Sequence, residues 1–79
     1  RLSSQEEREL TKKMNALERK MSKLDEQAEK VSATMAEVAA ATVLDTEQLT
    51  KLDAQLKDIT AQREELEMEW LELGEKLEG

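Results

Sequence analysis

Acidic side chains form the most crowded group that could bind a cation or act as acids and bases. The sequence places six glutamates within twelve residues of its last third: Glu64, Glu65, Glu67, Glu69, Glu72 and Glu75. Spaced in this way around a helix, their carboxylates point in several directions and do not converge on one ion. We therefore interpret them as a solvated helix face.

The residue types that most enzymes use for catalysis are missing. The sequence has no His and no Cys, which removes the usual zinc ligands and the partners in Ser–His and Cys–His catalytic groups. Its two glycines, Gly74 and Gly79, cannot build a phosphate-binding loop of the GxxxxGK[ST] type. We expect no catalytic residue, no metal site and no cofactor site in this chain.

Basic side chains in the first half have the spacing of a surface stripe. The heptad assignment given below puts five of them at the outer positions b, c and f: Arg8, Lys12, Arg19, Lys23 and Lys30. A stripe of this kind can follow a phosphate backbone, so these residues are the candidate contacts to nucleic acid. An ordinary solvated face is the alternative, because Glu7, Glu26 and Glu29 lie among them and the net charge is −7.

The charge is distributed unevenly along the chain. Residues 1–40 hold eight basic and eight acidic residues, whereas residues 41–79 hold four basic and eleven acidic ones. The whole net charge of −7 therefore comes from the second half. This asymmetry predicts a rod with two differently charged faces.

Composition predicts an all-α protein with one small domain. Charged residues make up 39% of the 79 residues, aromatic residues 1%, and there is no Pro, which together are typical of long or coiled helices. No stretch approaches the roughly 20 apolar residues of a membrane span, and the first residues lack a signal-peptide core, so we expect a cytoplasmic protein. Because the chain begins with Arg1, we expect a domain cut from a larger protein, unless a Met was simply not included.

A heptad pattern predicts the first helix. Apolar residues follow one another at alternating spacings of four and three, as in the seam of a coiled coil. The core positions are Leu10, Met14, Leu17, Met21, Leu24, Ala28, Val31, Met35 and Val38. Upstream, Ser-x-x-Glu occurs at Ser3 and again at Ser4, which predicts a capping box and a helix over about residues 4–40.

The pattern breaks after Val38, which predicts a turn over about residues 41–45. Asp45, with Gln48 three residues later, predicts a second capping box and a helix over about residues 46–78. A new seam follows in that helix: Leu49, Leu52, Leu56, Ile59, Arg63, Leu66, Trp70, Leu73 and Leu77.

The two seams fit each other as an antiparallel pair. When residues are paired so that their numbers total 87, a positions meet d positions in nine layers, from Val38 with Leu49 to Leu10 with Leu77. The sequence thus predicts a two-helix antiparallel coiled-coil hairpin, which we favour over a parallel dimer of one continuous helix. Because one thin seam leaves the flanks exposed, we expect a monomeric hairpin or a weak homodimer.

Arg63 and Trp70 are unusual members of the second seam. We expect the Arg63 stem to pack beside Leu24 while its guanidinium reaches an acidic neighbour. A polar layer that fixes the register is the alternative. Trp70 is interpreted as a core anchor rather than as a platform on which a base stacks.

Charged residues beside the seam give a mixed prediction. Lys20 is placed to reach Glu69 across the two helices, which favours the hairpin. Glu18 and Glu67 occupy facing e positions and are expected to repel each other.

Two segments resemble a known family. Residues 1–10 read RLSSQEEREL, and residues 69–73 read EWLEL. Along its whole length the chain resembles the C-terminal coiled-coil domain of the ABC-F ATPases, particularly the Uup-like branch. In that family a segment of the type K-L-S-Y-K-E-x-R-E-L leads into the first helix, and a W-L-E-L segment closes the second. The chain departs from this pattern at Ser4 and Gln5, where the family often has Tyr-Lys, and at the turn, which lacks the family's Asp-Pro step.

The resemblance implies a non-catalytic accessory domain of a larger ATPase. Its parent would have two ATP-binding cassettes, absent from this chain, that use ATP and Mg, and would act on ribosomes in translation or its quality control. In Uup-like proteins this domain is associated with binding nucleic acid, which points to Arg8, Lys12, Arg19 and Lys23. Expected partners are therefore the ribosome, RNA or DNA, or the parent's own cassettes, and no membrane. The alternative is a structural coiled coil that mediates protein association only.

Overall fold

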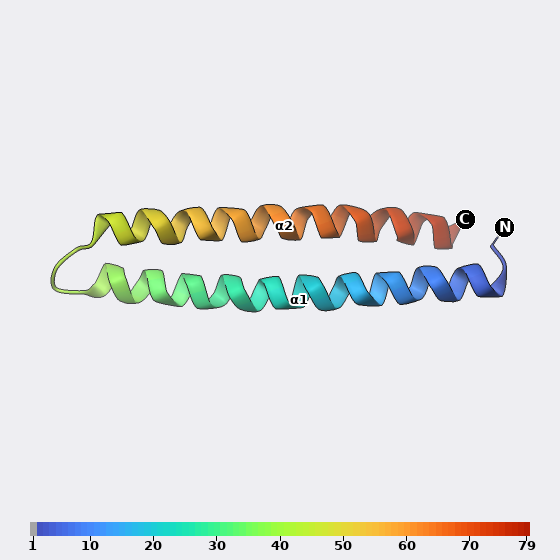
Figure 1. Ribbon diagram of the computed structural model, residues 1–79, viewed down its shortest axis with the longest axis horizontal. Coiled ribbons are helices and arrows are strands. Elements are labelled where there is room, and N and C mark those ends of the chain that lie inside the picture. Colours follow the sequence, from blue (N-terminus) through green and yellow to red (C-terminus); the bar gives the residue numbers. More distant parts are fainter. Residues whose placement is uncertain (1) are drawn as a thin grey trace.

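The computed structural model describes residues 2–79 as two helices, α1 (Ser4–Ala40) and α2 (Thr46–Glu78). The helices run side by side in opposite directions, so both ends of the described chain lie together and the turn lies at the far end (Figure 1). The resulting rod measures 61 × 14 × 13 Å. The predicted all-α antiparallel hairpin is confirmed, and the single continuous helix that a parallel dimer would need does not form.

Side-chain caps fix where the two helices begin. At the start of α1 the Glu6 amide donates to Ser3 Oγ at 3.2 Å, and the Ser3 amide donates to Glu6 Oε1 at 3.4 Å. This is the reciprocal capping box expected from the sequence, and it uses Ser3 rather than Ser4. At the start of α2 the Gln48 amide donates to Asp45 Oδ1 at 3.0 Å. Only this half of the second box is formed among the described residues, with no return bond from the Gln48 side chain.

The turn is where the heptad pattern breaks. Ala41 leaves the helical region with ψ 151°, and its amide donates to the Val38 carbonyl at 3.3 Å. Val43 and Leu44 are 81% and 57% exposed, so the turn is not held by packing of its own apolar side chains. The adjoining helix ends and the Asp45 cap define its path.

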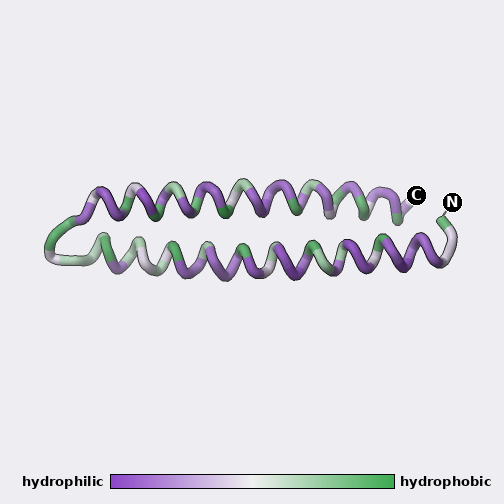
Figure 2. Tube along the Cα trace, in the orientation of Figure 1, coloured by the Kyte–Doolittle hydropathy of each residue, from purple (hydrophilic) through white to green (hydrophobic). Residues whose placement is uncertain are grey.

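One apolar seam holds the helices together. Along both helices, most hydrophobic positions face the other helix and most hydrophilic positions face outward (Figure 2). All of the expected core positions are buried or half-buried. The tightest packing lies toward the end that holds the termini, at Leu17, Met21, Leu24 and Leu73, which are 6–9% exposed.

Three contacts between the helices establish the register. The Gly74 backbone lies beside Met14, since a Cβ added there would be 3.5 Å from the Met14 Cε. Trp70 bonds to Glu18, and Arg63 bonds to Asp25. In each contact the two residue numbers total 88. This is expected when the core layers total 87, because each contact joins a core residue to the residue that follows its layer partner.

The Arg63 guanidinium extends out of the seam and pairs with carboxylates of both helices. Its Nε donates to Asp25 Oδ1 at 2.6 Å, and its Nη1 donates to Glu67 Oε2 at 3.3 Å. Within residues 2–79 the Asp25 contact is the single ion pair that joins α1 to α2. The hydrogen bond to Asp25 raises the pKa of the Arg63 guanidinium above its ordinary value, and the attraction of the same carboxylate adds to this. The side chain is 37% exposed, which fits a stem packed at the seam and a charged end that reaches outward.

The predicted repulsion between Glu18 and Glu67 is relieved by a donor on each side. The Trp70 indole N–H donates to Glu18 Oε1 at 3.1 Å, while Arg63 takes Glu67. Half-buried on the seam, Trp70 therefore anchors the core and also binds a flanking carboxylate. On the other flank, the predicted pair of Lys20 with Glu69 is not formed among the described residues.

Truncating a buried side chain of the seam should cost more stability than truncating an apolar side chain of the turn. We expect Leu24→Ala to lower the free energy of unfolding by about 2–3 kcal/mol, because it removes buried methyl groups. The matched change Leu44→Ala removes the same atoms from a 57% exposed position and should cost less than about 0.5 kcal/mol. Urea unfolding at low temperature, followed by helical circular dichroism, measures both. Equal losses would show that the seam is not the source of stability.

The Arg63 ion pair predicts a salt-dependent contribution to stability. We expect Arg63→Gln to lower the Tm at low salt, because Glu18, Asp25 and Glu67 then share one flank without their cation. The loss should shrink in high salt and in an Asp25→Asn background. Lys57→Gln is the control, since it breaks a 2.9 Å pair with Asp53 inside α2 and should lower the Tm less. Thermal melts that show the same loss in both salts and both backgrounds would contradict the prediction.

Candidate nucleic-acid interface

The five candidate basic residues all lie on α1 and are all exposed: Arg8, Lys12, Arg19, Lys23 and Lys30. At roughly 1.5 Å per residue, the distance along the helix from Arg8 to Lys30 is about 33 Å. This is close to one helical turn of duplex DNA, which is roughly 34–36 Å long. The stripe is therefore about as long as one turn of such a duplex.

Positive charge is concentrated in a shorter part of the stripe. Residues 12–23 contain five cations and one carboxylate, Glu18. That carboxylate accepts the Trp70 indole hydrogen bond and lies at the flank that faces α2. The segment is consequently the most basic stretch of α1. Lys30 lies apart from it, beyond Glu26 and Glu29.

Two further lysines, Lys13 and Lys20, belong to this basic segment. Both are exposed and occupy g positions next to the candidate residues. The sequence prediction missed them because it selected only the outer positions b, c and f. A count of charge along residues 12–23 would have found them without any knowledge of the fold.

The surface under the stripe is shallow. Arg8 and Lys12 line one open hollow on α1, and Lys23 lines a groove between the helices together with Lys20. Arg19 lines neither of them. The arrangement is an open edge without an enclosing pocket, and such an edge suits a long polyanion better than a small ligand.

The candidate cations of α1 form no ion pairs with carboxylates of the described residues. In the part of the chain that the structure describes, none of the five candidate residues takes part in an ion pair. On α2, by contrast, Lys51 pairs with Glu47 at 3.6 Å and Lys57 with Asp53 at 2.9 Å. The α1 cations thus remain available to an external anion, whereas these two α2 lysines are already engaged.

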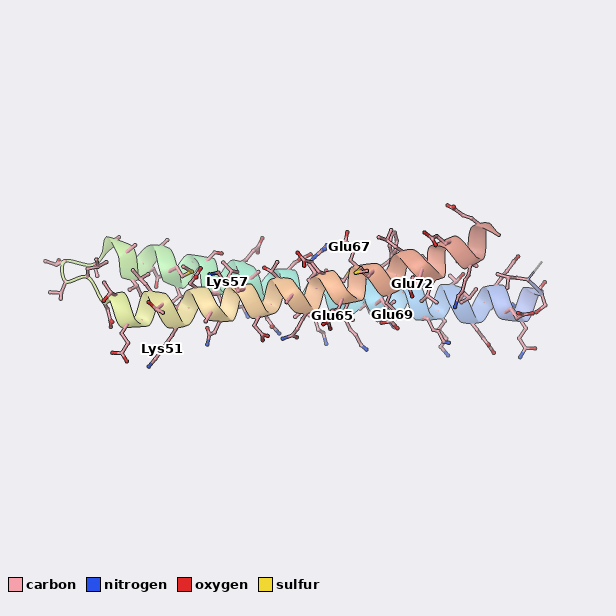
Figure 3. All side chains as sticks on the ribbon, turned by 90° about the horizontal axis from the view of Figure 1, so that it is seen from above. Lys51, Lys57, Glu65, Glu67, Glu69 and Glu72 are labelled. Carbon is pink, nitrogen blue, oxygen red and sulfur yellow. The ribbon has the colours of Figure 1, made fainter. Side chains whose placement is uncertain are left out.

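The glutamates of α2 do not form a cation site. Glu65 and Glu69 extend from one edge of the helix, and Glu67 extends from the opposite edge (Figure 3). Over residues 2–79, no three His, Cys, Asp or Glu side chains are grouped so that they could hold a metal ion. Neither α1 nor α2 has a stretch long and apolar enough to cross a membrane.

Comparison with known proteins identifies the family. No curated protein and no solved structure matches the chain. The family model of the ABC transporter C-terminal domain matches residues 1–75, which is nearly the whole sequence. The basic edge described above therefore lies on a hairpin that belongs to the ABC transporter C-terminal domain family.

Proposed function

We propose that this hairpin is a non-catalytic accessory arm of an ABC-F protein and that it helps its parent to engage a ribosome or another nucleic-acid partner. The basic segment of α1, residues 12–23, makes the contact. The observation that carries the proposal is a concentration of five exposed cations on one helix of a protein whose net charge is −7, none of them ion-paired within residues 2–79.

The form of the contact follows from the surface. An exposed basic edge binds phosphate through charge and releases counterions, without reading base edges. Trp70, the one aromatic residue, is half-buried on the seam and bonds to Glu18, so it does not offer a free ring to a base. The arm therefore adds affinity and orientation, and sequence preference would come from other parts of the parent.

Catalysis in this proposal belongs to the parent. ATP and Mg would be bound by ATP-binding cassettes outside the present chain, and the arm would act in the cytoplasm, where ribosomes are. The membership in the ABC transporter C-terminal domain family supports this assignment. The hairpin supports it as well, because a rod with one thin seam has no interior in which to bury a nucleotide.

Neutralising the basic segment should weaken nucleic-acid binding. We expect the Lys12→Gln, Arg19→Gln, Lys23→Gln variant to lose most of the affinity for labelled ribosomal RNA and duplex DNA at low salt. If each of the three cations contacts one phosphate, the slope of log K against log salt for duplex DNA should become less steep by about 2.7. Fluorescence anisotropy of the 79-residue chain at low and physiological salt measures both quantities.

A control variant separates local contact from net charge. The Lys51→Gln, Lys57→Gln, Lys76→Gln variant loses the same number of cations from α2, and should retain most of the affinity. Circular dichroism confirms that both variants stay helical. Equal losses in the two variants would show that net charge, and not the α1 edge, governs binding. No binding by the unmodified chain even at low salt would overturn the proposal.

A second candidate function is association with a protein surface, such as the parent's own cassettes. One observation favours it: Met68 and Leu71 lie three residues apart on α2 and are 64% and 51% exposed. Residues at this spacing share a helix face, so they form a small apolar patch away from the seam. A hairpin that binds no nucleic acid would leave this role as the better account.

A further inference from the structure

The most basic part of α1 packs against the most acidic part of α2. Residues 12–23 hold five cations and one carboxylate, whereas residues 64–75 hold six glutamates and no cation. The bond from Trp70 to Glu18 joins these segments, and Gly74 lies beside Met14 within them. Two segments of opposite net charge therefore lie side by side over about three helical turns.

The basic segment of α1 and the acidic segment of α2 border each other along one edge of the rod. A groove there is lined by Lys20 and Lys23 of α1, which we call the lysine pair, and by Gln62 and Glu65 of α2. The apolar side chains of Leu24 and Leu66 complete it. Glu65 and Glu69 extend from the same edge of α2, and we call them the acidic pair (Figure 3).

Glu65 of the acidic pair lines the same groove as the lysine pair, and Glu69 extends from the same edge of α2. Within residues 2–79 neither lysine forms an ion pair, and neither do Glu65 and Glu69. Charges that share one groove still act on each other, because the screening length is about 10 Å at 0.1 M salt. The lysine pair therefore keeps its charge free for a ligand, but the acidic pair lowers the attraction that an incoming anion feels.

We propose that Glu65 and Glu69 determine which anions the basic segment can bind, by competing with phosphate for Lys20 and Lys23. This inference rests on the proposed function. A weakly charged ligand does not outcompete two carboxylates that are already in place. A duplex or folded RNA does, since duplex DNA carries one charge for about every 1.7 Å of its axis. The acidic pair thus makes the arm selective for polyanions of high charge density.

Removing the acidic pair tests this directly. We expect Glu65→Gln, Glu69→Gln to bind labelled duplex DNA about fivefold more tightly at low salt, with the gain shrinking at physiological salt. Binding of a single strand of the same sequence should increase more, so the preference for duplex falls. The matched control is Glu64→Gln, Glu75→Gln, which removes the same charge from outward b and f positions and should change affinity less than about twofold. Anisotropy titrations measure all three proteins side by side.

A second pair of substitutions locates the effect. In a Lys20→Gln, Lys23→Gln background, removal of the acidic pair should no longer tighten binding, because the lysines for which the carboxylates compete are gone. Equal gains in the acidic-pair variant and its control, or a gain that persists without the lysine pair, would overturn this inference while the proposed function stands. If neither the unmodified chain nor the acidic-pair variant binds duplex DNA or ribosomal RNA, the proposed function falls and this inference falls with it.

Discussion

A single apolar seam between two helices is the constraint on which the rest of this structure depends. Each helix has only one neighbour, so each can cover only a narrow stripe of its surface. No side chain among residues 2–79 is fully buried, and the four best covered are still 6–9% exposed. Almost all charged residues consequently remain at the surface, where they define two flanks and two outer faces. The surface that the rod offers to other molecules is therefore largely charged.

Charged side chains are arranged differently on the two flanks of the seam. On one flank, acidic residues of both helices are held by specific donors: Arg63 binds Asp25 and Glu67, and Trp70 binds Glu18. On the other flank, Lys20 and Lys23 of α1 share an open groove with Glu65 of α2, and within residues 2–79 no ion pair joins them. The first arrangement fixes structure, and the second leaves charge available. This contrast explains why an acidic protein can still present a basic edge.

The sequence predicted most of the fold, because a hairpin is governed by periodicity and caps. The alternating spacings of three and four identified the seam, and Ser3 and Asp45 marked the two helix starts. Uneven packing along the seam was not predicted, since a heptad pattern treats every layer alike. The best covered side chains are Leu17, Met21, Leu24 and Leu73, whereas residues of similar size nearer the turn, such as Met35 and Leu52, are only half-buried.

The candidate site was only partly predictable. Heptad positions placed the five outer basic residues on one helix but left out Lys13 and Lys20, which occupy g positions; Lys20 was instead assigned to Glu69 of the partner helix. The pairing of individual charges was not predicted either. Within residues 2–79 Lys20 forms no ion pair with Glu69, while Trp70 donates to Glu18 and Arg63 donates to Glu67. Long side chains choose among several partners within reach, so their pairing depends on geometry that spacing alone does not give.

The off-centre position of the best packing has a consequence for how the chain folds. Contacts at the turn, such as Val38 with Leu49, close short loops at little entropic cost, but the layers there are only half-buried. The strongest layers, around Leu17 and Trp70, join residues 53 positions apart and form only after the helices have aligned. If the two helices pair first at the turn and then layer by layer toward the termini, most of the free energy of folding is gained in the last steps. Changes near the turn should act mainly on the folding rate, and changes near the termini mainly on the unfolding rate.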